Sequence, residues 1–582
     1  MEPKDRVYCN PLNLNYRYQL MKTLLHKKAF REAADPSAVM FRGRLYLFAS
    51  MSGGFWVTSD LAEWEYHELS GLPVHDYAPD VRVIGDELYF CASKRTKSCP
   101  IYRTHDPLTE PFEEVSRPFA FWDPNLFADD DGRVYFYWGC SNRTPVCGVE
   151  MDPAKMTPIG EKRALVFDQS GDHGFERTGE DHVPAKPKTF GQKLLRAAFG
   201  TAPYIEGAWM TKHDGRYYLQ YAAPGTEYNV YADGVYCGAH PLGPFAYARN
   251  NPFSYKPGGF ITGAGHGSTF EDRFGNLWHV SSMRISVNHA FERRIGLFPA
   301  GFDEQGELFC NQRYADWPQA VLQGRFDPWR EPEWMLLSYR KKATASSSAG
   351  GHLPQNAADE DVRTCWQAAS DKEGEWLMLD LGEPMDVHAV QINFADCGTQ
   401  ADLPQGAVVD GQFPMKRYIE QRVLFTRWLL ETSSDGKVFE TLCDKRAART
   451  DLPHDLVVPD RPVRARFLRL SGMRLPYGQK AAVSGLRVFG KGGGARPEQI
   501  GGVTAERKGP LDLQVRWEQS GALGVTVLWG YALNRLYHSR MVFGRSSVDI
   551  GALNRGQDCY IRVDAFNEAG ITHGAVVPAK TL

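Results

Sequence analysis

A strand–turn–strand unit recurs five times in the first half of the chain, and this repeat constrains the fold more than any other feature. Each unit opens on a polar residue, runs through a short strand to a glycine turn, and ends in an aromatic-rich strand. The opening residues are Asp35, Asp80, Asp123, Glu206 and His266. Their spacings are 45, 43, 83 and 60 residues. A period of about 40–50 residues is typical of one β-propeller blade, so the sequence predicts a five-bladed β-propeller.

The propeller geometry predicts that the opening residues meet. The first strand of each blade lines a central channel, so equivalent positions in the five units converge on one opening. Buried carboxylates without partners are costly, and four of them beside a histidine therefore favour a chemical role. Glycoside hydrolysis requires at least two carboxyl groups on opposite sides of a gap that holds a sugar. A third carboxylate nearby raises the pKa of the acid by like-charge repulsion.

The motifs around these residues resemble glycoside hydrolase family 43 over roughly residues 10–320. Each motif is short, but all of them follow the order of the family. The matching segments are Ala34–Ser37, Trp56–Leu61, Trp122–Gly132, Ile205–Gly207, Leu242–Phe245 and Gly265–Ser268.

The resemblance implies a role for four of the opening residues. Asp35 would be the general base that activates water, and Glu206 the general acid that protonates the glycosidic oxygen. Asp123 would raise the pKa of Glu206 and help to orient it. The family inverts the anomeric configuration, which predicts a separation of about 6.5–9.5 Å between the carboxyls of base and acid. His266 would lie at the channel floor and help to hold a hydrated calcium ion.

Six further residues flank these positions and are candidates for binding the sugar. Five are aromatic and could stack on a sugar ring, although each could equally pack in the core. The sixth is an arginine, placed where members of the family often have one in the pocket. The six are Phe55, Tyr77, Trp122, Trp209, Tyr228 and Arg284.

The second half of the chain predicts two further domains. Proline, tryptophan and arginine residues after the repeats mark a boundary, so the propeller is expected over residues 1–325. Residues 326–492 resemble a discoidin, or coagulation factor C-type, β-sandwich, with an insertion at 396–428. This domain would either bind carbohydrate or stabilise the propeller. Residues 493–582 follow a glycine-rich linker and resemble a fibronectin type III β-sandwich. The predicted fold class is therefore all-β.

Composition and charge restrict the classes of molecule that this protein is expected to bind. The formal net charge of −3 lacks the basic excess typical of nucleic-acid binding, and no apolar run is long enough to span a membrane. The first residues lack the apolar core of a signal peptide, so we expect a cytoplasmic protein, or a secreted one if a leader has been removed. The 11 cysteines are scattered, which predicts free thiols and argues against a zinc site.

Together these observations predict an exo-acting, inverting glycoside hydrolase. It would release terminal α-L-arabinofuranose or β-D-xylose from plant-derived oligosaccharides. A β-D-galactofuranosidase, or another exo-glycosidase on the same scaffold, is the alternative within this class. The alternative from another class is a carbohydrate-binding protein without catalytic activity. The expected partner is the oligosaccharide, and calcium is the expected cofactor.

Overall fold

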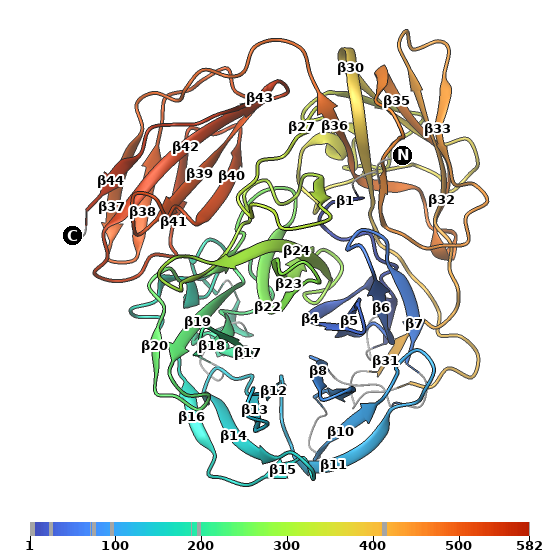
Figure 1. Cartoon of the computed structure of the whole chain (residues 1–582). Coiled ribbons are helices and arrows are strands. Elements are labelled where there is room, and N and C mark those ends of the chain that lie inside the picture. The colour runs from blue at the N-terminus through green and yellow to red at the C-terminus, as the bar shows by residue number, and fades with distance from the viewer. Residues whose placement is uncertain are drawn as a thin grey trace.

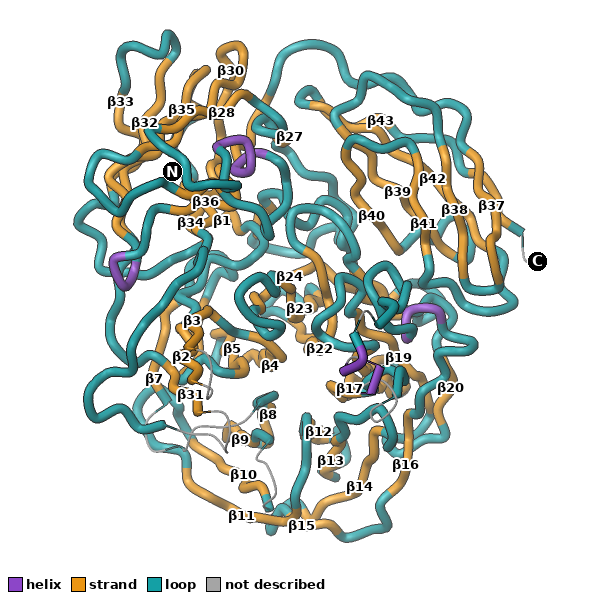
Figure 2. The backbone as a smooth tube through the Cα atoms, turned by 180° about the vertical axis from the view of Figure 1, so that it is seen from behind, coloured by secondary structure: helices purple, strands orange, loops and turns teal. Residues whose placement is uncertain are grey.

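The computed structural model describes residues 6–22, 27–69, 72, 77–93, 98–187, 189–191, 193–194, 200–409 and 416–580. Strands and loops make up nearly all of this part of the chain (Figures 1 and 2). The 3₁₀ helices are η1 (Gly174–Glu176), η2 (Pro354–Ala358) and η3 (Pro476–Gly478). No helix among the described residues has the length and apolar character needed to cross a membrane. The predicted all-β class is confirmed.

Within the described residues, the first half of the chain forms five blades around a common centre, as Figure 1 shows. This confirms the predicted propeller. The first blade contains β4 (Ala34–Phe41), β5 (Arg44–Ser50), β6 (Gly54–Thr58) and β7 (Glu65–Glu68). The second blade contains β8 (Asp80–Ile84), β9 (Glu87–Cys91), β10 (Cys99–Thr104) and β11 (Glu113–Phe119). The third is β12 (Asn125–Ala128), β13 (Val134–Trp138) and β14 (Val146–Asp152), with β15 (Thr157–Pro158) and β16 (Arg163–Val166).

The fourth and fifth blades are joined by a parallel bridge between Ala232 and Ala264. The fourth is β17 (Glu206–His213), β18 (Arg216–Ala223) and β19 (Ala232–Gly238), with β20 (Phe245–Tyr247) and β21 (Ser254–Tyr255). The fifth is β22 (Thr262–Glu271), β23 (Leu277–Arg284), β24 (Arg293–Phe302) and β25 (Leu308–Cys310). Near the N-terminus, β1 (Arg6–Tyr8) pairs with β26 (Gln319–Val321).

Local sequence explains the blade hairpins. Asp214 and Gly215 both have positive φ (46° and 73°), the conformation that a two-residue hairpin turn requires and that Asp-Gly adopts readily. Alternating side chains then fill the seams between blades. Phe48, Phe55 and Phe90 belong to the apolar cluster between the first two blades. The packed seams hold the opening residue of each unit at the centre.

The second domain is organised around one long strand, β30 (Trp376–Phe394). Its first part pairs with β28 (Lys342–Ala345) and β35 (Val463–Arg474), and its second part with β34 (His454–Val457) and β36 (Ala482–Lys491). Trp366 and Trp428 lie fully buried in its core. The other strands are β27 (Met335–Leu336), β29 (Trp366–Gln367), β32 (Arg427–Ser433) and β33 (Glu440–Asp444).

The third domain has two sheets that enclose Trp529 and other buried residues. The first contains β37 (Thr504–Gly509), β38 (Asp512–Arg516) and β41 (Ser547–Ile550). The second contains β39 (Gly524–Gly530), β40 (His538–Phe543), β42 (Cys559–Asn567), β43 (Gly570–Thr572) and β44 (Val577–Ala579). No described strand crosses residue 325 or residue 492, where we expected the domain boundaries.

One strand of the second domain pairs with the N-terminal segment. β2 (Tyr18–Lys22) forms a hairpin with β3 (Lys27–Arg31), and β31 (Lys416–Ile419) pairs with the other side of β2. The buried guanidinium of Arg31 reinforces this contact by pairing with Asp396 (3.2 Å) and Asp451 (2.6 Å). The insertion predicted at 396–428, of which residues 410–415 lie outside the described part, therefore contacts the propeller.

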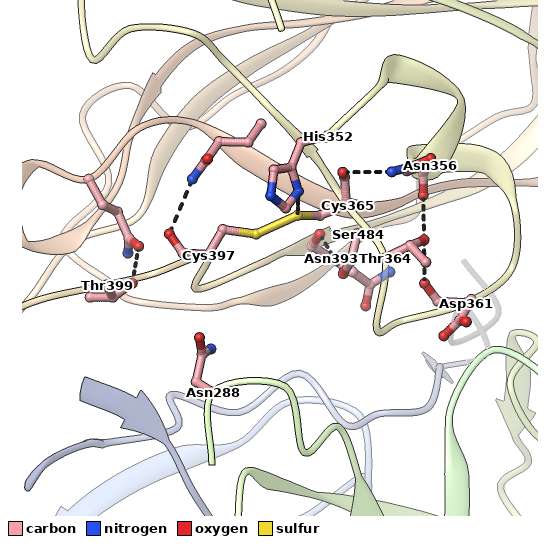
Figure 3. The surroundings of a disulfide bond; sticks show 12 residues. Asn288, His352, Asn356, Asp361, Thr364, Cys365, Asn393, Cys397, Thr399 and Ser484 are labelled. Atoms are coloured by element: carbon pink, nitrogen blue, oxygen red, sulfur yellow. Dashed lines mark hydrogen bonds between the residues drawn. A yellow bond between two sulfur atoms is a disulfide. The ribbon is translucent and has the colours of Figure 1, made fainter. Parts of the chain in front are cut away.

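The cysteines differ from expectation at one place. Cys365 and Cys397 form a disulfide in the second domain, and His352 Nδ1 lies 3.2 Å from Cys365 Sγ (Figure 3). The other nine are free thiols, as predicted. The pair was missed because 32 residues separate its members, and only folding brings them together.

Candidate active site

Irregular backbone marks the inner strand at three of the opening residues. Asp35, Asp123 and His266 have φ values of 50°, 47° and 50°, in the left-handed region that residues other than glycine rarely adopt. The pairing of β4 with β5 and of β22 with β23 shifts register beside Asp35 and His266. Such bulges turn a side chain out of the ladder and are common beside active sites.

Four of the five opening residues meet, as the repeat predicts. His266 Nδ1 lies 3.4 Å from Asp35 Oδ1 and 3.7 Å from Asp123 Oδ2. Single ligand atoms of Asp123, Glu206 and Cys140 all lie within 4.8 Å of one another. Asp35, Asp123 and Glu206 are at most 9% exposed. Three carboxylates from three blades thus share one buried site with a histidine.

Asp35 is held as an anion by a network of donors. Arg293 donates Nη1 to Oδ1 (2.8 Å) and Nη2 to Oδ2 (3.2 Å), and Ser50 Oγ donates to Oδ2 at 2.7 Å. Burial alone would raise the pKa of Asp35, but Arg293 and His266 outweigh burial and lower that pKa below its ordinary value. An ionised carboxylate can accept a proton from water.

A second buried carboxylate supports Arg293 from the other side. Arg293 Nη2 and Nε donate to Glu32 Oε1 at 2.7 Å and 3.2 Å. Glu32 is fully buried, and burial raises its pKa to about 7 against the opposing charge of Arg293. The guanidinium is therefore fixed between two carboxylates, which sets its orientation toward Asp35.

Glu206 is positioned by two donors that differ in kind. Tyr231 donates its hydroxyl to Oε1 at 2.6 Å, and Cys140 donates its thiol to Oε2 at 3.0 Å. The next residue must be glycine, because a Cβ on Gly207 would lie 2.8 Å from the ring of His266. Both carboxylate oxygens are thus oriented while the backbone passes close to the histidine.

Two further groups in the site have shifted pKa values. Burial, opposed by His266 and reinforced by Glu206 and Asp35, raises the pKa of Asp123 to about 7. Burial would lower the pKa of His266, but the surrounding carboxylates outweigh burial and raise it. The two aspartates therefore differ in pKa: Asp35 is ionised, whereas Asp123 holds its proton up to about neutral pH.

Asp80, the remaining opening residue, has a structural environment. Its carboxylate accepts hydrogen bonds from Asn125 Nδ2 (3.0 Å) and Leu126 N (2.7 Å) in the next blade, and from Ser37 Oγ (3.5 Å) in the preceding one. It therefore joins three blades.

Comparison with known proteins agrees with this geometry. The family model described as glycosyl hydrolases family 43 matches residues 31–307, which include all four converging side chains. Residues 31–307 are a family 43 glycosyl hydrolase domain. The chain is therefore a glycosidase. The F5/8 type C domain model matches residues 342–409, so the second domain is discoidin-like, as predicted.

Curated relatives cover mainly the family 43 domain. Xylosidase/arabinosidase 43A of Humicola insolens is 26% identical over 265 residues, 37% of this chain and 78% of that protein. Beta-D-galactofuranosidase xynD of Aspergillus niger is 24% identical over 314 residues, 47% of this chain and 81% of that protein. A solved structure described as "Glycoside hydrolase" is 17% identical, with a TM-score of 0.44, and covers 78% of this chain and 97% of that one.

Three predicted sugar-binding residues of the family 43 domain lie beside its carboxylates or remain partly exposed. Tyr77 faces Arg293, whose Cζ lies 5.8 Å from the ring centroid. Trp122 is half-buried and directly precedes Asp123, and Tyr228 is half-buried three residues before Tyr231. These three rings remain candidates for stacking on sugar.

The other three predicted sugar-binding residues are buried in packing contacts. Phe55 is 1% exposed and stacks on Phe48 in the seam between blades. Trp209 is 3% exposed and lies under Arg82, whose Cζ is 3.4 Å from its ring. Arg284 is 3% exposed and pairs with Glu180 at 2.8 Å. Their side chains already have partners within the protein, which disfavours contact with a sugar.

The structure also brings in residues that the sequence analysis missed. Two of them lie where the third strand of a blade begins: Arg293 is its first residue and Tyr231 immediately precedes it. The other two lie where the second strand ends: Ser50 is its last residue and Cys140 follows it. In an antiparallel blade these positions share an edge with the start of the first strand. A search of the sequence for polar residues at these strand ends could therefore have identified them. Arg284, the arginine that we predicted for the pocket, is the cross-strand partner of Arg293.

The calcium ion implied by the resemblance can be compared with the groups around His266. Nδ1 already faces Asp35 and Asp123, so Nε2 is the nitrogen left for a metal. Calcium prefers about six to eight oxygen ligands. Among the described residues, no group of three possible metal ligands includes His266. One imidazole nitrogen is a weak donor for calcium, so water would have to supply most of the oxygen ligands, and the calcium ion stays a prediction.

Proposed function

We propose that the family 43 domain is an exo-acting, inverting glycosidase that releases terminal α-L-arabinofuranose or β-D-xylose from plant-derived oligosaccharides. The observation that carries this proposal is the convergence of Asp35, Asp123 and Glu206 around His266. The names of the curated relatives, a xylosidase/arabinosidase and a beta-xylosidase among them, support the choice of sugars.

In the proposed reaction a single displacement cleaves the bond. Asp35, ionised beside Arg293, takes a proton from water as the water attacks the anomeric carbon. Glu206 gives its proton to the glycosidic oxygen as that bond breaks, and both proton transfers accompany one inversion at carbon. Asp123 lies beside Glu206, with one carboxylate oxygen of each within 4.8 Å of the other. Calcium, when bound at His266, would supply positive charge near the carboxylates.

A galactofuranoside is the second candidate substrate. The match to a beta-D-galactofuranosidase extends over 47% of this chain, a longer stretch than the match to the xylosidase/arabinosidase. Arabinofuranose and galactofuranose share the five-membered ring, so one pocket shape suits both better than it suits a pyranose.

We also propose that the third domain is fibronectin type III-like. Its strand order supports this assignment, because β37, β38 and β41 form one sheet while β40, β39 and β42 form the other, with β44 paired to β42. We assign no chemistry to this domain.

Release of nitrophenol from four aryl glycosides tests the proposed activity. The panel contains the α-L-arabinofuranoside, β-D-xylopyranoside, β-D-galactofuranoside and α-L-arabinopyranoside. We expect turnover of the first or second, and strong turnover of the third alone would select the galactofuranoside. No release from any of them, and no cleavage of oligosaccharides that the protein binds, would overturn the proposal in favour of a carbohydrate-binding protein.

A further inference from the structure

Three side chains of the discoidin-like domain that are good metal ligands lie together, away from the active site. His352 Nδ1 is 3.2 Å from Cys365 Sγ, and Cys397 Sγ completes the group (Figure 3). One ligand atom from each of the three lies within 4.8 Å of the others. Cys365 is 4% exposed, whereas His352 and Cys397 are half-buried, so water can reach the group.

Hydrogen bonds hold the backbone around this group. Gln367 N donates to the carbonyl of His352 at 3.3 Å, which ties the loop of His352 to β29. The side chain of Asn356 donates to the Cys365 carbonyl, and that of Gln367 to the Cys397 carbonyl, each at 3.1 Å. Three segments that are distant in the sequence therefore present their ligand atoms from supported positions, as a metal site requires.

The spacing of the three residues suits a tetrahedral zinc ion. Zinc binds thiolate sulfur at about 2.3 Å and imidazole nitrogen at about 2.0–2.1 Å, which places neighbouring ligand atoms about 3.5–3.8 Å apart. The 3.2 Å between His352 and Cys365 is close to this separation. The Cα atoms of the two cysteines are 7.8 Å apart, beyond the range of about 4.4–6.8 Å that is usual for a disulfide. Two sulfurs freed from each other can therefore reach the spacing that one zinc ion needs with little movement of the backbone.

The chemistry of the ligands selects zinc. Thiolate and imidazole are the donors that zinc prefers, and two thiolates neutralise the charge of the ion. In the part of the chain that the structure describes, no fourth cysteine, histidine or carboxylate belongs to the group, so water would complete the tetrahedron. Calcium prefers oxygen ligands, which separates this site from the calcium expected at His266.

We propose that Cys365 and Cys397, when reduced, bind one zinc ion together with His352, and that the disulfide is the oxidised, zinc-free form of the same site. A dithiol reductant supplies two electrons and two protons to the S–S bond and becomes a disulfide itself, which leaves two thiols. Zinc then displaces the two thiol protons and binds both sulfurs. Oxidation of the two thiolates restores the disulfide and releases the ion. A reducing compartment favours the zinc-bound form.

The position of the site suggests what the ion would hold together. Cys397 directly follows Asp396, whose carboxylate pairs with the buried Arg31 at 3.2 Å. These residues begin the insertion whose strand β31 pairs with β2. Zinc would join the start of the insertion to β29, as the disulfide does, so this link would persist when the cysteines are reduced. The inference does not depend on the glycosidase activity.

Protection of thiols by zinc tests the proposal in the unmodified full-length protein. The chain is reduced with a dithiol, separated from it without oxygen, and alkylated with and without one equivalent of zinc. Mass spectrometry should show alkylation of Cys365 and Cys397 slowed about tenfold or more by zinc, and that of Cys443 changed less than about twofold. Cys443 is the matched control because it is a half-buried free thiol of the same domain. Equal rates at Cys365 and Cys397 with and without zinc, or a disulfide that resists the dithiol, would overturn the proposal.

Metal content gives an independent test. Reduced wild-type protein, equilibrated with zinc and then freed of excess, should retain one ion per chain more than Cys397→Ser or His352→Gln. Cys443→Ser and His388→Gln should retain as much as the wild type, because both residues are half-buried in this domain and lie outside the group. Cobalt in place of zinc should give a thiolate-to-metal charge-transfer band that Cys397→Ser lacks. A wild type that binds no more metal than His352→Gln and Cys397→Ser would overturn the proposal. Circular dichroism identifies a variant that fails to fold, in which case the alkylation of the wild type decides.

Discussion

Arg293 and Asp35 form a two-point contact in which Nη1 donates to Oδ1 at 2.8 Å and Nη2 donates to Oδ2 at 3.2 Å. Neither residue is more than 5% exposed, and Glu32 holds the guanidinium from its other side. The pair therefore fixes where the base points as well as its charge. Because β24 begins at Arg293, the fifth blade sets the geometry of a residue in the first.

Replacing Arg293 by lysine keeps the charge but removes the planar two-point contact. We expect kcat/KM on the best aryl glycoside to fall about 100-fold, because the base loses its orientation. Arg284→Lys is the matched comparison, since Arg284 pairs with Glu180 and, in the described part of the chain, forms no ion pair with the three carboxylates, and its kcat/KM should stay within about threefold. A larger loss for Arg284→Lys than for Arg293→Lys would reverse our assignment of the two arginines.

The Glu206→Gln substitution removes the proposed acid while preserving shape. Turnover should fall about 10²–10⁴-fold with little change in KM, because the amide cannot protonate the leaving oxygen. Glu271→Gln serves as the control, because Glu271 is an exposed glutamate at the end of β22. Steady-state kinetics on an unactivated oligosaccharide decides whether Glu206 is the acid, because a sugar hydroxyl leaves only when it is protonated, whereas nitrophenolate leaves without that help. Unchanged turnover of the oligosaccharide by Glu206→Gln would eliminate this residue as the acid.

Inversion can be observed directly in the product. A single displacement from the face of Asp35 should release the sugar with the anomeric configuration opposite to that of the substrate. Proton NMR recorded in the first minutes of the reaction, before mutarotation equilibrates the anomers, identifies the product. First-formed sugar of unchanged configuration would require a covalent intermediate and would contradict the proposed role of Asp35.

Removal of metal tests the proposed calcium ion. We expect a chelator to lower turnover and added calcium to restore it, since the ion would contribute charge beside His266. Magnesium, which demands stricter geometry and a smaller shell, should restore less activity. Full activity after exhaustive chelation, with no calcium detected by elemental analysis, would contradict a role for calcium in this site.

His182 makes the folded state sensitive to acid. It is buried, its ring nitrogens lie 3.1 Å from the Arg177 carbonyl and 3.0 Å from the Tyr255 hydroxyl, and burial lowers its pKa to about 4. Between about pH 6.5 and pH 4 the unfolded chain binds a proton here that the folded chain does not, so stability falls as the pH falls through this window. The expected loss is about 3 kcal/mol.

Thermal unfolding at pH 7 and pH 4.5 measures this effect. His182→Gln should unfold at a lower Tm than the wild type at pH 7, yet lose less Tm on acidification. His240→Gln, at an exposed histidine, should follow the wild type at both values. An identical acid response in wild type and His182→Gln would show that His182 does not titrate as described.

The repeat alone predicts the centre of the site. Asp35, Asp123, Glu206 and His266 occupy equivalent positions, and the symmetry of a propeller brings such positions together whatever separates them in sequence. Their hydrogen-bond partners lie at the same edge of the blades but in the second and third strands, which the opening residues do not mark. Tyr231 lies outside the repeated unit, and its contact with Glu206 depends on how the edge of the fourth blade packs.

Side-chain burial limited the prediction of sugar-binding residues. Phe55 and Tyr77 are both aromatic and both close in sequence to an opening residue, yet Phe55 packs within a seam and Tyr77 faces Arg293. The direction of a single ring depends on the pleat and register of its own strand, which aromatic content does not reveal. The role of β31 was equally hidden, because it depends on pairing between two domains.

The pairing of β2 with β31 also limits how this gene can be rearranged. A chimera that joined the propeller to an unrelated second domain would leave one side of β2 with unpaired backbone donors and acceptors, and such an edge recruits strands from other molecules. Recombination at the boundary near residue 325 would therefore yield a chain prone to aggregate unless the new partner supplied its own strand.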